Sequence, residues 1–192
     1  MYQKYTTDGF LVSSHPSGEA DRVFLFLTRE FGMIRAHATS VRHSKSKLRP
    51  HIAAGALLSL TFLRSKIRWR ILEVAAPSKA LDPQSAEYKT FAQIMLVLKS
   101  LIQGEEKNES LFESVMELYK FLSCGSPTTS EMLSSAECLA MIKILHALGY
   151  GEPKGDIVGD DAQYNEAAFE NINAHKKDLI AGINSALADT GL

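Results

Sequence analysis

Short runs of alternating apolar and polar residues fill the first 75 residues, and this period of two is typical of β-strands. Turn-forming segments such as His15-Pro16-Ser17-Gly18 separate the runs. The pattern predicts five strands, at residues 6–13, 22–28, 33–41, 57–63 and 67–74. Because closure removes the exposed edges of such short strands, we expect them to form a small barrel.

From residue 77 onward the apolar residues recur at helical spacing. Capping residues and glycines mark the ends of three predicted helices, which run from Asp82 to Gly104, from Asn108 to Gly125 and from Ser130 to Leu148. A last helix is predicted from a single apolar stripe that contains Phe169, Ile172, Leu179, Ile180, Ile183 and Leu187. These four amphipathic helices predict a small bundle.

The two patterns together predict an α+β protein with two domains. Residues 1–76 are assigned to an N-terminal five-stranded β-barrel of the oligonucleotide-binding (OB) type, and residues 77–84 to a linker. Residues 85–192 are assigned to an all-α helical domain, in which residues 149–160 link the third helix to the last one.

Composition narrows the class of protein. The chain has 192 residues, of which 45% are hydrophobic and 22% are charged, as in an ordinary soluble globular protein. Its N-terminus lacks the apolar run of a signal peptide, and no apolar stretch is long enough to span a membrane. We therefore expect a cytoplasmic protein with no membrane partner, whose two cysteines are reduced thiols.

Charge is strongly segregated along a chain whose net charge is only −1. Residues 1–80 carry thirteen Lys or Arg against five Asp or Glu, whereas residues 81–192 carry eight against seventeen. Between Glu30 and Glu73 there is no acid at all. This interval contains nine candidate DNA-binding residues: Arg35, Arg42, Lys45, Lys47, Arg49, Arg64, Lys66, Arg68 and Arg70. Such a cluster predicts electrostatic binding of a nucleic acid backbone, with little dependence on base sequence.

Alternation within residues 67–74 indicates where these charges point. Arg68 and Arg70 are two residues apart and therefore have the same parity, which means that they alternate onto the same face of the strand. Arg64 and Lys66 continue this parity back through the preceding turn, and Trp69 has the opposite parity. Side chains alternate between the two faces of a strand, so we expect the cations outside and Trp69 in the core. A second interpretation is that Trp69 stacks on an unstacked base, and the sequence leaves the same question open for Phe31 and Phe62.

Motifs of catalysis are missing from the sequence. There is no phosphate-cradling glycine loop, no Gly-x-Ser-x-Gly and no His-Glu-x-x-His. Acids near the predicted barrel could in principle bind Mg²⁺, but their spacing does not demand it; they are Asp8, Glu19, Asp21 and Glu30. We expect a protein that is not an enzyme and that has no cofactor or metal.

Four segments of the chain form a specific combination: Gly18-Glu19-Ala20-Asp21-Arg22, Leu27-Thr28-Arg29-Glu30-Phe31-Gly32, Ser44-Lys45-Ser46-Lys47-Leu48-Arg49 and Ile144-Leu145-His146-Ala147-Leu148-Gly149-Tyr150. These segments are similar to the RecO family of bacterial recombination mediators. The resemblance covers the barrel and, more loosely, the helical half up to about Pro153.

This resemblance implies an OB domain packed on a helical domain, with no catalytic centre. Members of the family bind single- and double-stranded DNA, anneal strands, and work with RecR to load the RecA recombinase onto DNA coated by single-strand-binding protein (SSB). It places Lys45, Lys47 and Arg49 on the DNA-binding face. Within the matched motif, Asp21 and Arg22 are expected to pair locally or to organise the first hairpin.

The chain also departs from the family pattern. Many members carry a four-cysteine zinc module, whereas this chain has Cys124 and Cys138 alone, so zinc is not expected. It is also shorter than typical members. In some relatives the SSB tail docks in the helical domain, and Lys143 is the candidate cation for that site here.

Two questions remain open at this stage. The acidic stretch 156–170 is either a solvated linker with a helix start or a competitor of DNA for the basic residues. The alternative function is an OB-fold adaptor that binds RNA or an acidic protein partner through the same basic face.

Overall fold

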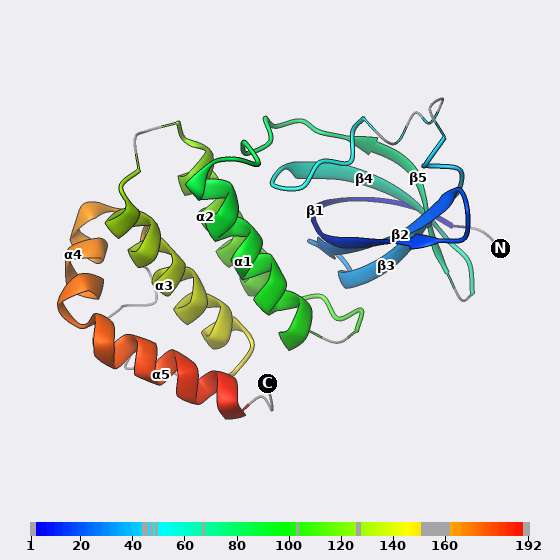
Figure 1. Ribbon diagram of the computed structural model, residues 1–192. Coiled ribbons are helices and arrows are strands. Elements are labelled where there is room, and N and C mark those ends of the chain that lie inside the picture. Colours follow the sequence, from blue (N-terminus) through cyan, green and yellow to red (C-terminus); the bar gives the residue numbers. More distant parts are fainter. Residues whose placement is uncertain are drawn as a thin grey trace. The chain divides into compact units, whose positions relative to one another are not determined.

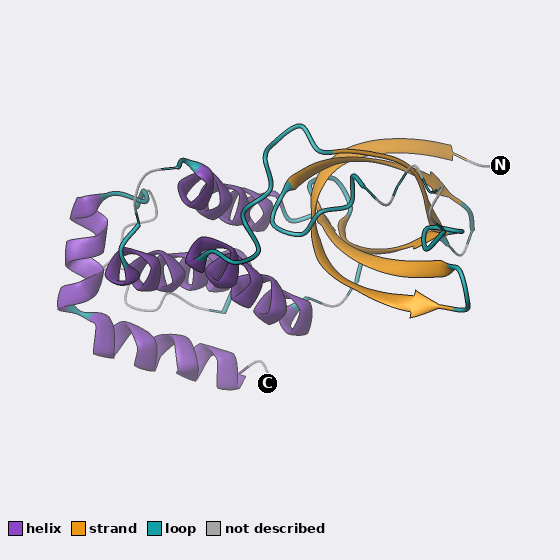
Figure 2. Cartoon of the chain, turned by 45° about the horizontal axis from the view of Figure 1, so that its top comes forward, coloured by secondary structure: helices purple, strands orange, loops and turns teal. Residues whose placement is uncertain are grey.

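The computed structural model describes residues 3–43, 46, 48, 50–66, 68–102, 104–125, 128–150 and 162–189. The chain divides into two compact units. One unit consists of residues 1–82 together with 102–109, and the other of residues 83–101 and 110–192. The first unit contains the strands and the second contains the helices (Figure 2).

The five predicted strands are present, and they form a barrel (Figure 1). They are β1 (Gln3–Ser17), β2 (Asp21–Thr28), β3 (Gly32–Ala38), β4 (Leu57–Arg64) and β5 (Trp69–Ala75). The barrel closes in the order β1-β2-β3-β5-β4, with β3 and β5 parallel and the other pairs antiparallel. The predicted fold class, an OB-type domain followed by helices, is confirmed.

Strand β1 is longer than predicted because it serves two neighbours. Its first half pairs with β4, and its second half pairs with β2. The register shifts between Leu11 and Ser13, where a bulge lets one strand bend from one partner to the next. This long, bent strand closes the barrel.

Inward positions of the strands fill the barrel with aromatic and aliphatic side chains. The buried cluster includes Phe24, Phe26, Ile34, Leu58, Leu60, Phe62, Trp69 and Ile71. Burying each large side chain of this kind contributes about 1.5–3 kcal/mol to the free energy of unfolding. The alternation that predicted the strands therefore also predicted the core.

A segment beyond the strands completes this unit. Residues 102–109 follow the first helix, yet they group with the barrel. Lys107 Nζ lies 3.2 Å from Glu30 Oε2, and the backbone of Glu106 lies against Gly32, whose φ is +63°. The predicted division had placed these residues in the helical domain.

The helical unit contains α1 (Ala86–Leu101), α2 (Glu109–Ser123), α3 (Ser130–Ala147), α4 (Glu166–Ala174) and α5 (Lys176–Asp189). Helix α3 packs against α1, α4 and α5, and it is apolar on most of its circumference, as a buried helix is. Its first turn is capped by Thr129, whose side chain accepts a hydrogen bond from the Met132 N–H. Within the described residues, no helix is long and apolar enough to cross a membrane.

The last predicted helix is two helices, so the prediction of four was wrong. The break lies at His175, whose φ of −114° is not helical and whose N–H is shared between the carbonyls of Asn171 and Ile172. Ile180, which the sequence assigned to the buried stripe, is 43% exposed. Most of the predicted 149–160 linker lies outside the described residues.

Candidate nucleic-acid interface

Four of the predicted DNA-binding residues lie on or beside the outer surface of β3 and β5. The parallel pairing aligns Ala36 with Trp69 and His37 with Arg70. Ala36 and Trp69 are buried, so the positions beside them face outward, and continuing the register by one residue sets Arg35 beside Arg68. Arg35, Arg68 and Arg70 are all exposed.

The turn between β4 and β5 fixes the backbone that carries two of these cations. The Ser65 N–H and hydroxyl donate to the Arg68 carbonyl at 2.9 and 3.0 Å. The Arg68 N–H in turn donates to Ser65 Oγ at 3.1 Å. Lys66 is exposed within this turn, next to the arginines on β5. The turn therefore holds Lys66 and Arg68 on a hydrogen-bonded frame.

These four cations, Arg35, Lys66, Arg68 and Arg70, are named the outer cation row. Within the part of the chain that the structure describes, no ion pair involves any of them. Arg70 Nη2 donates to Thr39 Oγ1 at 3.1 Å, a contact that orients the guanidinium without neutralising it. The row therefore presents positive charge without an internal counter-ion.

Arg64 does not share this arrangement, and the parity argument was wrong for it. Its backbone pairs with Trp69, which points inward, and parity is not conserved through the intervening turn. The Arg64 guanidinium lies 4.7 Å from the centre of the Trp69 ring, and its Nη2 is 3.3 Å from Glu105 Oε2. Glu105 thus partly neutralises Arg64.

Trp69 belongs to the core, as its parity predicted. It is 3% exposed, and its ring lies 5.1 Å from Phe31 and 5.8 Å from Phe62 between ring centres. Phe62 is fully buried. Neither Trp69 nor Phe62 can therefore stack on a base in this conformation, whereas Phe31 is only partly buried and its role stays open.

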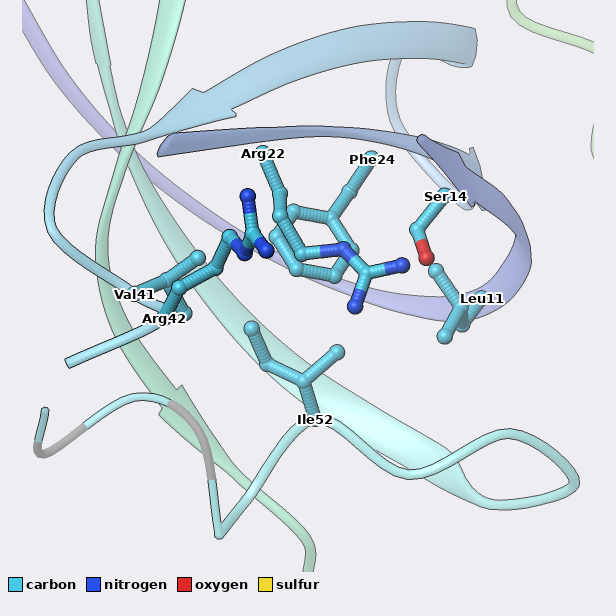
Figure 3. A pocket seen from close by; sticks show the side chains of 7 residues that line it. All are labelled: Leu11, Ser14, Arg22, Phe24, Val41, Arg42 and Ile52. Carbon is cyan, nitrogen blue, oxygen red and sulfur yellow. The ribbon is translucent and has the colours of Figure 1, made fainter. Parts of the chain in front are cut away.

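Arg42 lines a pocket of about 410 Å³ in the barrel unit. Its N–H donates to the Ala20 carbonyl at 3.0 Å, and its Nη1 donates to the Glu19 carbonyl at 2.9 Å. The walls are formed by Leu11, Ser14, Arg22, Phe24, Val41, Arg42 and Ile52 (Figure 3).

Sequence reasoning missed the position of Arg22 in this pocket. Asp21 binds beyond the first hairpin, because its Oδ1 accepts the Ser40 N–H at 2.7 Å and so ties the start of β2 to the turn after β3, where Ser40 has a φ of 57°. Arg22 has the same parity as Phe24 and Phe26, which point into the barrel. The sequence did offer a signal for this position, because Arg22 is a charged residue that alternates in phase with inward-facing phenylalanines.

Other predicted residues are placed as follows. Lys45, Lys47 and Arg49 lie outside the described residues. In the helical unit, Lys143 Nζ is 2.6 Å from Glu117 Oε2, so the candidate cation for an SSB tail already has an acidic partner. Within the described ranges, no three metal-binding side chains come together.

Comparisons with known proteins bear on the barrel most directly. A family model described as Recombination protein O N terminal matches residues 1–70. The chain is 48% identical over 116 residues to a DNA repair protein RecO of Acaryochloris marina and 33% identical over 102 residues to one of Cutibacterium acnes. It is 26% identical over 124 residues to one of Thermodesulfovibrio yellowstonii.

These alignments cover part of each protein. They take in 57%, 53% and 62% of this chain, and 38%, 40% and 48% of the respective relatives. The chain therefore spans less than half the length of the curated relatives that it matches.

Proposed function

Residues 1–70 belong to the recombination protein O N-terminal family, as the motifs predicted, and from this premise we propose that the protein acts in DNA repair and recombination. In this proposal it binds DNA through the outer cation row and does so without catalysis. It works in the cytoplasm on single- and double-stranded DNA.

The observation that carries the proposal is the lack of counter-ions on the outer cation row. Among the described residues its cations have no acidic partner, so they are available to phosphates, and each neutralised phosphate releases condensed counter-ions. Arg35 and Arg70 lie on two hydrogen-bonded strands and Arg68 directly precedes β5, so the protein backbone that carries them is already ordered when DNA docks.

Annealing follows from the same electrostatics. Two complementary strands repel each other, and a cationic surface that holds both lowers this repulsion. The partners RecR and SSB, and indirect loading of RecA, are carried over from the family resemblance. They belong to this proposal and need their own binding experiments.

A second candidate is an adaptor that binds RNA or an acidic protein through the same row. It is favoured by the burial of Trp69 and Phe62, because a row of cations without a stacking platform has no means of reading a base or a 2′-hydroxyl. Competition between DNA and RNA oligonucleotides of equal sequence separates the two functions. Preferential competition by RNA favours the adaptor.

The proposal is tested by annealing two complementary fluorescent oligonucleotides in the presence of the protein. Arg68→Glu/Arg70→Glu reverses two charges of the outer cation row, and Lys89→Glu/Lys99→Glu reverses two exposed charges on α1 as a matched control. We expect annealing by the wild type and the control, and its loss in the first variant. Unchanged Trp69 emission checks folding, and equal annealing by all three proteins would contradict the proposal.

A further inference from the structure

The pocket beside Arg42 combines two cations with an apolar lining. Leu11, Phe24, Val41 and Ile52 supply the apolar wall, and Ser14 adds a hydroxyl. Both arginines line the pocket: the guanidinium of Arg22 points toward Ser14 and Leu11, and that of Arg42 lies beside the stem of Arg22 (Figure 3). Its volume of about 410 Å³ is in the range of sites that hold small organic ligands.

Arg22 is the residue that calls for an explanation. Its Nε is buried and has no hydrogen-bond partner, and no ion pair involves Arg22 within the described residues. A buried donor of a charged group that lacks an acceptor is strongly unfavourable, because the lost hydration is not replaced. A ligand that enters the pocket can supply the missing acceptor.

Arg42 is already held in place for that ligand. Two backbone carbonyls, those of Glu19 and Ala20, fix its guanidinium and its N–H, and neither carries a formal charge. Arg42 therefore keeps its positive charge while its position is set. A pre-positioned arginine loses little side-chain entropy when it binds an anion.

We propose that this pocket binds the terminal phosphate monoester of a DNA strand, with the attached nucleoside against the apolar wall. The inference rests on the proposed function and adds a recognition site for strand ends. A terminal phosphate carries nearly two negative charges at neutral pH, whereas an internal phosphodiester carries one. Two arginines that have no acidic partner among the described residues match the monoester better.

The test uses short oligothymidylates that carry an internal fluorophore and differ only at their ends. One has a 5′-phosphate, one has a 3′-phosphate and one has hydroxyls at both ends. Anisotropy titrations compare the wild type with Arg22→Met, which keeps an unbranched apolar stem and removes the charged guanidinium. Lys99→Met removes one exposed charge on α1 as the matched control.

We expect wild type and Lys99→Met to bind one phosphorylated strand about tenfold more tightly than the hydroxyl-ended strand. Arg22→Met should bind all three strands equally, with the affinity of the wild type for the hydroxyl-ended one. Equal binding of the three strands by the wild type, or a preference that survives in Arg22→Met, would overturn the proposal.

A second measurement separates this site from the outer cation row. Thermal unfolding is followed by Trp69 emission with thymidine monophosphate, inorganic phosphate or thymidine added. Stabilisation of the wild type by the monophosphate alone, absent in Arg22→Met, supports the site even if strands bind too weakly to titrate. Absence of stabilisation overturns it, and the annealing experiment then still decides the proposed function.

Discussion

The indole Nε1 of Trp69 donates a hydrogen bond of 2.8 Å to Oε1 of Glu105, 36 residues further along the chain. The other carboxylate oxygen of Glu105 lies 3.3 Å from Arg64 Nη2. A single carboxylate therefore satisfies a buried indole and balances the cation that lies over the same ring. This contact explains why residues 102–109 group with the barrel and not with the helices around them in sequence.

Removal of the Glu105 carboxylate should destabilise the barrel. Glu105→Ala leaves the Trp69 N–H without an acceptor, and we expect the free energy of unfolding to fall by about 1–3 kcal/mol. Glu105→Gln keeps an acceptor and loses only the partly exposed ion pair, for which we expect about 0.5 kcal/mol. Urea denaturation followed by emission of Trp69, the single tryptophan, measures both variants. Equal losses would show that the indole hydrogen bond contributes nothing.

Gly32 should not tolerate a side chain. Its φ is +63°, and an added Cβ would overlap the backbone carbonyl of Glu106. We expect Gly32→Ala to lower the free energy of unfolding by more than about 2 kcal/mol, since backbone strain and steric overlap act together. Gly18→Ala is the matched control, because Gly18 has a φ of +73° and open space around it. Backbone strain alone should lower the free energy of unfolding by about 1 kcal/mol in Gly18→Ala. Chemical denaturation measures both variants, and equal losses would show that the overlap with Glu106 contributes nothing.

Arg22→Met should stabilise the protein in the absence of ligand. The substitution removes a buried, unpaired donor and keeps an apolar stem against Phe24, so we expect a gain of about 1 kcal/mol. Arg42→Met should instead lose about 0.5 kcal/mol, because it gives up the hydrogen bond to the Glu19 carbonyl. Thermal and urea unfolding measure whether the free energy of unfolding rises or falls in each variant. A loss of stability in Arg22→Met would mean that Arg22 is satisfied in solution.

Salt dependence should report on the outer cation row. If each of its four cations contacts one phosphate, log K for a single strand should fall against log salt with a slope of about −2.8. Arg70→Ala should reduce the slope by about 0.7, since one phosphate contact is lost. Arg64→Ala should change it less, because Glu105 already pairs with Arg64. Anisotropy titrations at several salt concentrations measure these slopes. A wild-type slope near −1 would exclude the outer cation row as the binding site.

The two thiols should react differently. Burial raises the pKa of the Cys138 thiol, and the thiolate is the nucleophile, so this residue should resist alkylation in the folded protein. Cys124 is exposed and should be modified. Mass spectrometry after brief iodoacetamide treatment distinguishes the two peptides. Urea should make Cys138 reactive, and early modification of Cys138 would indicate local opening of α3.

The sequence predicted the strands well because alternation reflects the two faces of a barrel wall. The sequence failed at Arg64, because alternation counted through a turn does not determine which face a side chain occupies. That face is determined by the pairing of Arg64 with Trp69 across the two strands. The break at His175 was invisible for another reason. Ile172 and Leu179 are seven residues apart, a spacing that keeps one helical stripe in phase whether or not the helix is continuous.

The pocket and the 102–109 segment depend on contacts that no local pattern reveals. Arg22 has an inward parity, but only the positions of Val41, Arg42 and Ile52 show that a space remains in front of it. Residues 102–109 have no periodic apolar pattern, and their place against Gly32 and Trp69 follows from tertiary structure. Such long-range features lie beyond sequence periodicity.

The association of residues 102–109 with the barrel has a consequence during synthesis. Strand β5 ends at Ala75, whereas the acceptor for its first residue, Trp69, is Glu105. A ribosome that adds about 5–20 residues per second needs roughly 2–6 s to make the residues between them. The nascent barrel must wait for all of α1 before its last hydrogen bond can form, so the two units finish folding in an interleaved order.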